Sequence, residues 1–352
     1  AKAGIALRLR KTGRRWVQTV KREDPKAAKA HGLFSHVEVE IPAPGGKLVL
    51  DGPDDQGVFA AIAEASGGAD LAPLFETRVR RIVERLAAPG GGEVELAIDH
   101  GEIVAGESRA PIREAEMELV SGDVTAVFEI ARVLFREGPL RFATSNKEAR
   151  GYRLAATGMA DLPLEPRNAG DLRYDADTPI ETVARDVLRD CFAQISVNMV
   201  VVAESEAPEG PHQLRVGLRR LRTALDLLGP SLGGAAIEAL SEKARSFGHV
   251  VGALRDIDVL IGEIVGPGTG GGLDAAARDA LLAELDRRRD AVRAEVRAAL
   301  AGPEALDFVL DLMRLVEARG WLEPSDYSQT ARLATPTGEI ASRLMDQRAR
   351  RA

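Results

Sequence analysis

The segment from His212 to Leu228 combines residue types that could bind a polyanion. At about 100° per residue, its basic residues fall in one stripe of a helix and its leucines in another. The basic residues are His212, Arg215, Arg219 and Arg222, with Arg220 in the same run. Arg presents a planar fork that binds phosphate oxygens through two hydrogen bonds. A solvated charged face is the alternative, but Lys or Glu normally dilutes such a face, and neither is present here.

Rows of like charge on predicted strands form a second candidate site, in the first half of the chain. The rows are Arg8 with Arg10, Arg78 with Arg80, and Glu114 with Glu116 and Glu118. Because alternate residues of a strand share a face, each row lies on one side of its strand. A closed sheet with these rows inside would be a charged tunnel, where Arg and Lys hold a phosphate chain and carboxylates hold a divalent metal. A plain antiparallel sheet with one solvated face is the alternative.

The elements that must position these residues differ between the two halves of the chain. Alternation of apolar and charged residues predicts strands at 5–10, 16–20, 37–41, 74–84, 93–99 and 113–120, with a turn at 100–101 and a last strand pair around 141–154. Amphipathic helices are predicted at 56–65 and 124–136. Residues 156–178 are rich in Gly and Pro and predict a linker. Long helices follow at 179–203, 211–228, 235–265, 274–301 and 303–318.

The composition is that of a globular protein with room for two domains. The chain has 352 residues, of which 45% are hydrophobic and 29% are charged. Its formal net charge of -7 argues against a general nucleic-acid binder, which is usually basic overall. Cys191 is the only cysteine, so no disulfide forms within the chain, which agrees with a reducing cytoplasm. No apolar run approaches the roughly 18 residues that span a bilayer, so no membrane partner is expected.

Two motifs in the second half resemble a known family. HQLRVGLRRLR, which starts at His212, and LRDIDV, which starts at Leu254, are together similar to the first half of a CHAD domain. The resemblance implies a histidine-containing helical domain that binds inorganic polyphosphate along a basic surface. Residues 329–352 look like the start of a second helical repeat, so the first repeat and the start of the second are expected here. A helix places Asp256 and Asp258 about 200° apart, so we expect one to brace an Arg of the basic helix and the other to cap or to face solvent.

The first half resembles a second family. Five of its segments occur in the order seen in CYTH domains, which belong to the triphosphate tunnel metalloenzymes. They are LRLRKTGRRWVQTVK (7–21), LFETRVRR (74–81), VELAIDHGEI (94–103), EAEMELVSGD (114–123) and SNKEARGYRL (145–154). The resemblance implies a β-barrel that encloses triphosphate and a divalent metal, Mg²⁺ or Mn²⁺. The family's opening strand, which carries an ExExK motif, is expected to precede residue 1.

The matching positions imply roles for individual residues. Phosphate would be contacted by Arg8, Arg10, Lys21, Arg78 and Lys147, with Arg80 on the same face as Arg78. Metal binding and water activation would fall to Asp99, Glu116 and Glu118, although Glu114 and Glu116 could be the matching pair instead.

These observations predict an α+β chain, in which an N-terminal antiparallel β-barrel precedes an all-α helical bundle. The expected boundaries are 1–155 for the tunnel-like domain, N-terminally incomplete, 156–178 for the linker and 179–352 for the CHAD-like domain. We predict a cytoplasmic, metal-dependent inorganic triphosphatase whose partners are inorganic triphosphate and polyphosphate. A non-catalytic polyphosphate-binding protein is the alternative. The lack of aromatic residues beside the Arg stripe argues against nucleic-acid binding, and the sequence predicts no particular oligomeric state.

Overall fold

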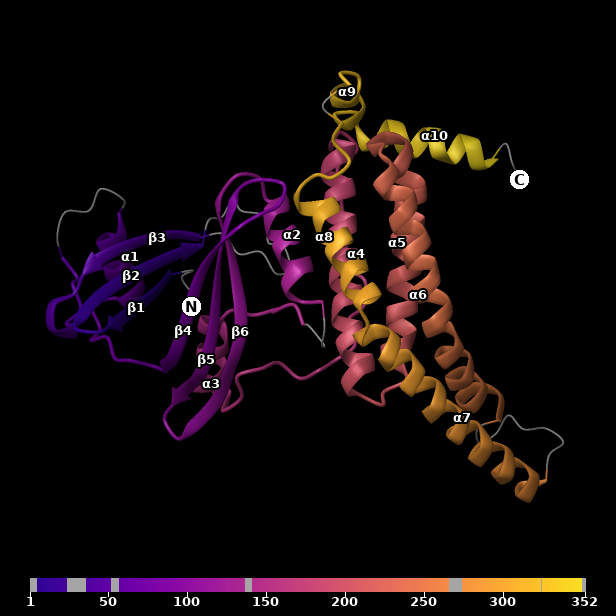
Figure 1. Cartoon of the computed structure of the whole chain (residues 1–352), viewed down its shortest axis with the longest axis horizontal. Coiled ribbons are helices and arrows are strands. Elements are labelled where there is room, and N and C mark those ends of the chain that lie inside the picture. Colours follow the sequence, from indigo (N-terminus) through magenta and orange to yellow (C-terminus); the bar gives the residue numbers. More distant parts are fainter. Residues whose placement is uncertain are drawn as a thin grey trace. The chain divides into compact units, whose positions relative to one another are not determined.

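A computed structural model, drawn in Figure 1, describes residues 5–23, 36–51, 57–136, 141–265, 274–323 and 325–349. The chain divides into two compact units. The first unit comprises residues 1–81, 98–114 and 143–162, and the second comprises residues 82–97, 115–142 and 163–352. Both units contain parts of β-strands, whereas the helices that follow residue 163 all belong to the second.

The N-terminal sheet contains three antiparallel strands, β1 (Ile5–Thr12), β2 (Arg15–Glu23) and β3 (His36–Pro42), in the order β1-β2-β3. A two-residue turn joins β1 to β2, and its Gly13 has a φ of 61°, a conformation that favours glycine. The register places Arg10 opposite Val17. A short 3-10 turn, η1 (Pro44–Gly46), and helix α1 (Val58–Ser66) follow. These elements confirm the first three predicted strands and the first predicted helix.

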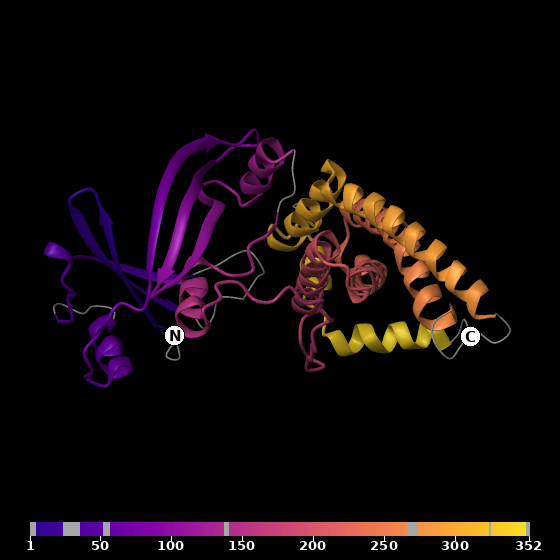
Figure 2. The ribbon, with the colours of Figure 1, turned by 90° about the horizontal axis from the view of Figure 1, so that it is seen from below.

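The second sheet holds three longer strands, β4 (Glu76–Ala87), β5 (Glu93–Ala105) and β6 (Ser108–Ser121), in the order β4-β5-β6. Figure 2 shows these strands running side by side. β5 continues through His100 and Gly101, so the turn predicted there is wrong. A Cβ added at Gly101 would lie 1.9 Å from the carbonyl oxygen of Arg78. The lack of a side chain at Gly101 therefore allows β4 and β5 to lie close together at this position.

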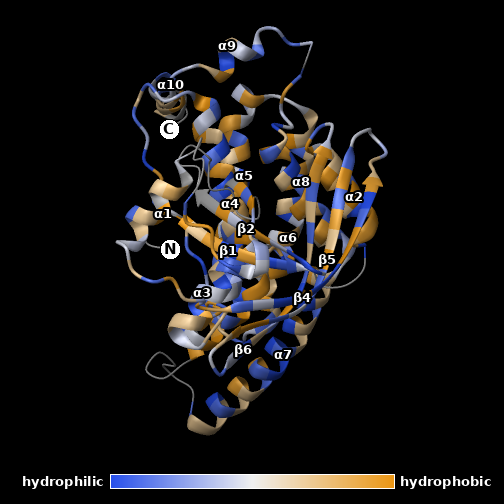
Figure 3. Cartoon of the chain, turned by 90° about the vertical axis from the view of Figure 1, so that its left-hand side faces the viewer, coloured by the Kyte–Doolittle hydropathy of each residue, from blue (hydrophilic) through white to orange (hydrophobic). Residues whose placement is uncertain are grey.

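One face of the second sheet is apolar at one end and acidic farther along. Its buried cluster consists of Ile103, Ala105, Ala110, Ile112, Leu154 and Ala160. The next residues of β6 on the same face as Ile112 are Glu114 and Glu116, because alternate residues share a face. Figure 3 shows hydrophilic and hydrophobic residues interleaved along these strands. The same face therefore carries both the buried apolar cluster and the two carboxylates of Glu114 and Glu116.

Helix α3 (Lys147–Thr157) stands where a strand pair was predicted around residues 141–154, so that prediction was wrong. Asn146 caps the helix by accepting a hydrogen bond from the N–H of Ala149 at 2.8 Å. The run KEARGYRLAA contains good helix formers and no β-branched residue. Its Leu154 belongs to the buried cluster of the second sheet. The cap, the helix propensity and the packing of Leu154 therefore all favour a helix in this segment.

The described strands form two separate three-stranded sheets and do not close into the barrel that we predicted. A barrel requires each strand to pair along both edges. In the part of the chain that the structure describes, β4 pairs only with β5, and most of its side chains on both faces are exposed. The coarser expectation of antiparallel sheets followed by a helical region holds.

The helical region lies in the second unit. Its helices are α4 (Ile180–Glu204), α5 (Glu209–Leu232), α6 (Ala235–Val259), α7 (Ala275–Ala301), α8 (Pro303–Glu317), α9 (Gln329–Leu333) and α10 (Thr337–Ala349), with a π-helical turn, η2 (Leu260–Val265), after α6. α5 packs against both α4 and α6, and α8 packs against α4. The five long predicted helices are confirmed. None of the helices described here has the length and apolarity needed to cross a membrane.

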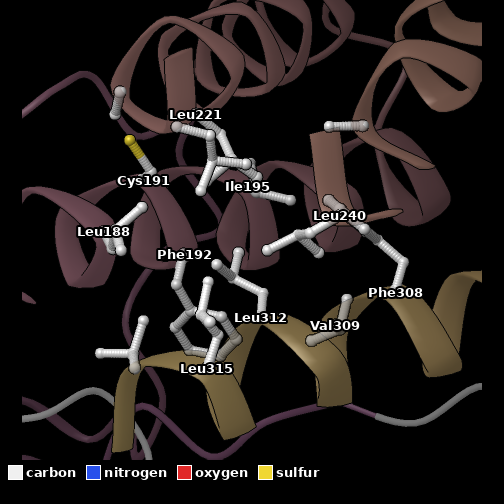
Figure 4. Close-up of a cluster of buried hydrophobic side chains, with 14 of the residues drawn as sticks. Leu188, Cys191, Phe192, Ile195, Leu221, Leu240, Phe308, Val309, Leu312 and Leu315 are labelled. Carbon is white, nitrogen blue, oxygen red and sulfur yellow. The ribbon is translucent and has the colours of Figure 1, made fainter. Parts of the chain in front are cut away.

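Buried side chains from several helices form the core of this region (Figure 4). Leu188, Cys191, Phe192 and Ile195 of α4 lie near Leu221 of α5, Leu240 of α6, and Phe308, Val309, Leu312 and Leu315 of α8. Burial raises the pKa of Cys191 to about 12, which is typical of a core residue and not of a nucleophile.

The core also includes Phe128 of α2 (Thr125–Leu134). Arg132 of α2 donates from Nη2 to Oδ1 of Asp311 on α8 at 2.5 Å, so an ion pair accompanies the apolar contact.

Candidate functional site

Three carboxylates meet on one face of the second sheet. They belong to Asp99 of β5 and to Glu114 and Glu116 of β6, and each offers an oxygen within 4.8 Å of the others. The two glutamates share a face because they are alternate residues of one strand, and β5 is paired alongside. Asp99 is buried, with 1% of its surface exposed, and the glutamates are partly buried. These three residues are termed the acidic cluster.

Cations from two other elements hold the acidic cluster. Arg81 of β4 donates from Nε to Oδ1 of Asp99 and from Nη2 to Oδ2, both at 2.7 Å. Lys147, the first residue of α3, places Nζ 2.8 Å from Oδ2 of Asp99 and also contacts Glu114. Nη1 of Arg150 lies 3.9 Å from Oε2 of Glu114. Burial raises the pKa of Asp99, but hydrogen bonds from Arg81 and Lys147 outweigh burial and bring it below its ordinary value of 3.8.

Close packing of α3 fixes the position of Lys147. Gly151 lies one helical turn after Lys147, against the ring of Phe75. A Cβ added at Gly151 would meet Cε2 of that ring at 2.2 Å. Phe75 also makes an edge-to-face contact with Tyr152, with the two ring centroids 5.2 Å apart. The absence of a side chain at Gly151 therefore allows α3 to approach the ring.

Gly151→Ala should lower the free energy of unfolding by about 1–3 kcal/mol, because the added methyl group would overpack the contact with Phe75. Helix propensity alone would raise the free energy of unfolding by about 1 kcal/mol, because Ala favours a helix more than Gly. The sign of the measured change therefore shows whether overpacking or helix propensity dominates. Urea unfolding measures it. Ala155→Ser, on the exposed side of the same helix, should change stability by less than about 0.5 kcal/mol. A more stable Gly151→Ala protein would contradict the tight Phe75 contact.

The oxygens of the acidic cluster fit a hard divalent cation. Mg²⁺ is usually held in proteins by one or two carboxylates together with phosphate oxygens of the substrate, and Mn²⁺ also prefers oxygen ligands. Asp99, Glu114 and Glu116 supply such oxygens from two neighbouring strands. The donor set therefore suits the Mg²⁺ or Mn²⁺ expected from the sequence.

Other residues that the sequence assigned to this site lie apart from the acidic cluster. Glu118 is exposed and is not one of the three clustered carboxylates. Arg78 is exposed and pairs with Glu76 at 3.1 Å and with Glu102 at 3.5 Å. Arg80 is also exposed. Of the two acidic pairs left open by the sequence, the structure brings Glu114 and Glu116 together with Asp99.

The sequence reasoning missed Arg81. Arg80 and Arg81 are consecutive residues of a strand, so their side chains leave opposite faces. Our interpretation followed the face shared by Arg78 and Arg80, whereas Arg81 is the residue that contacts Asp99. The doubled arginine was the available signal, because it supplies one charge to each face.

Arg8 and Arg10 of the N-terminal sheet are exposed. Arg8 and Arg10 are alternate residues of β1 and share a face. Nη2 of Arg10 donates to Oε1 of Glu40 on β3 at 2.9 Å. The side chain of Lys21 lies outside the described part of the chain. The roles of these three basic residues in phosphate binding stay predictions.

Helix α5 has the two faces that the sequence predicts. Its buried leucines are Leu214, Leu218, Leu221, Leu225 and Leu228. Arg215 and Arg219 are exposed, and His212 and Arg222 are partly buried. Nη1 of Arg215 donates to Oδ1 of Asp256 on α6 at 2.9 Å. This bond confirms that one carboxylate of the LRDIDV motif braces the basic helix.

Asp258 is buried, so the expectation that it caps or faces solvent was wrong. Neither of its oxygens has a hydrogen-bond partner among the described residues. Burial raises its pKa, against the opposing influence of Arg293, Arg289 and Arg255. Arg289 and Arg293 belong to α7, and the packing of α6 against α7 buries this carboxylate.

The basic helix and its bracing carboxylate belong to a region with known relatives. Residues 186–352 match the family model of the CHAD domain. An inorganic triphosphatase of Haemophilus influenzae is 30% identical over 159 residues, which make up 44% of this chain and 42% of that protein, so the chain spans less than half of the relative's length. The crystal structure of the CHAD domain from the plant Ricinus communis is 27% identical, with a TM-score of 0.43, over 52% of this chain and 57% of that one.

Within residues 186–352, Arg220 joins a buried polar network. Its Nη2 lies 2.9 Å from Oδ2 of Asp190 on α4, and its Nη1 donates to Gln194 at 2.6 Å. Asp190 also accepts from the N–H of Gly170 at 3.0 Å and from Nη2 of Arg167 at 3.1 Å. Burial raises the pKa of Asp190, but the bonds from Gly170, Arg220 and Arg167 outweigh burial and lower it overall. Arg220 thus has a structural task, and its role in phosphate binding stays a prediction.

Part of the predicted linker is docked on this network. Asn198 of α4 donates to the carbonyl of Arg167 at 2.8 Å and accepts from the N–H of Arg167 at 3.2 Å. Together with Asp190, it fixes residues 167–170, termed the docked segment. Asp190, Gln194 and Asn198 recur every four residues, which places three polar side chains on one face of a helix. That spacing was a signal for the network that the sequence reasoning missed.

Proposed function

We propose that the protein is a metal-dependent inorganic triphosphatase whose CHAD region binds inorganic polyphosphate. The observation that carries the proposal is the contact of the acidic cluster with Arg81 and Lys147, because carboxylates suited to a metal adjoin cations suited to phosphate oxygens. The similarity to the triphosphatase of Haemophilus influenzae and the match to the CHAD family support it.

Each part of the site has a task in phosphoryl transfer. A divalent metal held by Glu114 and Glu116 would polarise the phosphoryl group. Arg81 and Lys147 would bind non-bridging oxygens, and this reaction depends mainly on such positioning and charge neutralisation. Asp99 accepts both hydrogen bonds of Arg81 and contacts Lys147, so it orients these two cations. Because its pKa is held low, Asp99 acts as a positioning residue rather than as a base for the attacking water.

Phosphate release from tripolyphosphate tests the catalytic proposal. We expect release in the presence of Mg²⁺ or Mn²⁺ and none after EDTA removes the metal. A protein that binds tripolyphosphate but releases no phosphate with either metal would be the second candidate, a non-catalytic polyphosphate-binding protein. The observation that favours this second candidate is that Arg81 and Lys147 already neutralise charge in the acidic cluster.

Arg219→Ala should weaken binding of polyphosphate roughly tenfold at low salt. Arg219 is exposed on α5, one turn from Arg215 and close to Arg222, so a phosphate chain along the helix would contact it. Isothermal titration calorimetry with polyphosphate of defined length measures the affinity. Arg287→Ala, which removes an exposed arginine paired with Glu284 on α7, should change it less than about twofold. Equal losses in both variants would indicate attraction to overall charge instead of a site on α5.

A further inference from the structure

Two carboxylates of the acidic cluster are paired with cations of the chain itself. Asp99 contacts Arg81 and Lys147. Glu114 contacts Lys147 and lies 3.9 Å from Arg150, which also binds Asp161. A free divalent cation would therefore meet positive groups at short range.

Lys147 is held less rigidly than Arg81, so it is the cation that can move away from the acidic cluster. Arg81 is tied to both oxygens of Asp99 by two parallel hydrogen bonds, which fix its planar group. Lys147 carries a compact charge on a flexible four-carbon chain, and its Nζ contacts Asp99 and Glu114 at the same time. A metal bound to Glu114 would compete with this ammonium group for the same electron pairs.

We propose that Lys147 is an exchangeable counter-ion, which keeps free divalent metal out of the acidic cluster until a phosphate chain draws its ammonium group away. The metal then binds together with triphosphate and not before it. This inference rests on the proposed function and adds an order of binding to it.

Triphosphate has the chemistry to drive this exchange. Its oxygens carry several negative charges, so the ammonium group of Lys147 exchanges carboxylate oxygens for phosphate oxygens and stays paired throughout. Glu114 loses a cation in the same step and becomes free to bind the metal. Free metal lacks this route, because the displaced ammonium group, which is mostly buried, would be left without an anion.

Equilibrium dialysis of Mn²⁺ against the chain tests this order of binding. With Mn²⁺ alone, Lys147→Met should bind at least about tenfold more tightly than the wild type, because it lacks the competing charge. Lys147→Arg keeps the charge and should bind as weakly as the wild type. Lys243→Met is the matched control, since it removes a lysine that lies 2.6 Å from Asp311 on α8. It should leave Mn²⁺ binding unchanged.

A second dialysis with imidotriphosphate, whose bridging nitrogens resist hydrolysis, completes the test. The bound Mn²⁺ should rise in the wild type and in Lys243→Met, and the advantage of Lys147→Met should disappear. Equal Mn²⁺ binding by the wild type and Lys147→Met without imidotriphosphate would overturn the exchange and leave the metal site intact. No Mn²⁺ bound by any variant under either condition would overturn the metal site, and the proposed function with it.

Discussion

Glu114→Gln and Glu116→Gln should each slow metal-dependent phosphate release from tripolyphosphate at least about 100-fold, whereas Glu118→Gln should change it less than about threefold. Glu114 and Glu116 offer oxygens within 4.8 Å of each other and of Asp99, so each substitution removes a charged ligand from the proposed metal site. Glu118 is exposed and outside this group. A steady-state assay of phosphate release at saturating Mg²⁺ measures all three variants.

The three glutamine variants are matched in shape and differ in position, so they separate the two acidic pairs that the sequence left open. Circular dichroism shows whether each variant keeps its fold. A large loss in Glu118→Gln together with full activity in Glu114→Gln would assign the metal to Glu116 and Glu118 and would contradict the geometry of the acidic cluster. Loss in all three would indicate that negative charge along β6 matters more than any particular ligand.

Asp190→Ala should lower the free energy of unfolding of the helical region by about 3 kcal/mol at neutral pH, as expected when one partner of a buried ion pair is removed. Asp190 is buried and accepts hydrogen bonds from Gly170, Arg167 and Arg220. Its removal leaves Arg220 partly buried without its carboxylate and removes the hydrogen bonds that hold Gly170 of the docked segment. Urea unfolding followed by circular dichroism measures the loss.

The size of this effect should depend on pH. The pKa of Asp190 in the folded protein lies below its ordinary value of 3.8, so the ionised carboxylate stabilises the fold above that pH. This stabilisation is lost as the pH falls through the folded-state pKa. The difference between wild type and Asp190→Ala should therefore be largest near neutral pH and shrink below about pH 4.

A matched control comes from the same stretch of chain. Asp171 pairs with Arg173 at 2.8 Å, and both side chains are largely exposed. Asp171→Ala should change stability by less than about 0.5 kcal/mol, because exposed ion pairs contribute little. If both variants lost equal stability, the buried network at Asp190 would not be the cause.

The helical region could be predicted closely because its signals are local. The leucines of α5 repeat with the helical period, and burial follows that repeat. The spacing of Asp256 and Asp258 also predicted that one of them would brace an Arg of the basic helix, and Asp256 does so through Arg215. Local spacing did not predict the contact of Arg220. This residue follows Arg219 in sequence, but the rotation of about 100° per residue in a helix directs it toward Asp190 of α4.

The strand-rich part was less predictable because strand pairing depends on distant residues. Alternation along β6 placed Glu114 and Glu116 on one face, as the structure has them. Alternation could not show that Arg81, and not Arg78, lies opposite Asp99, since that depends on the register and facing of β4 and β5. The segment of α3 carried local helix signals, including the cap at Asn146. We nevertheless predicted strands there, because we gave more weight to the expected order of strands.

The contribution of α2 to the helical core has a consequence for dividing the protein into fragments. Phe128 packs in the same cluster as the side chains of α4 and α8, and Arg132 binds Asp311 of α8. A fragment that began at the predicted boundary of residue 179 would contain every long helix and still lack these partners, as well as the docked segment. The compact unit that holds this core is discontinuous in sequence, and truncation at the start of the CHAD match, residue 186, would cut through it.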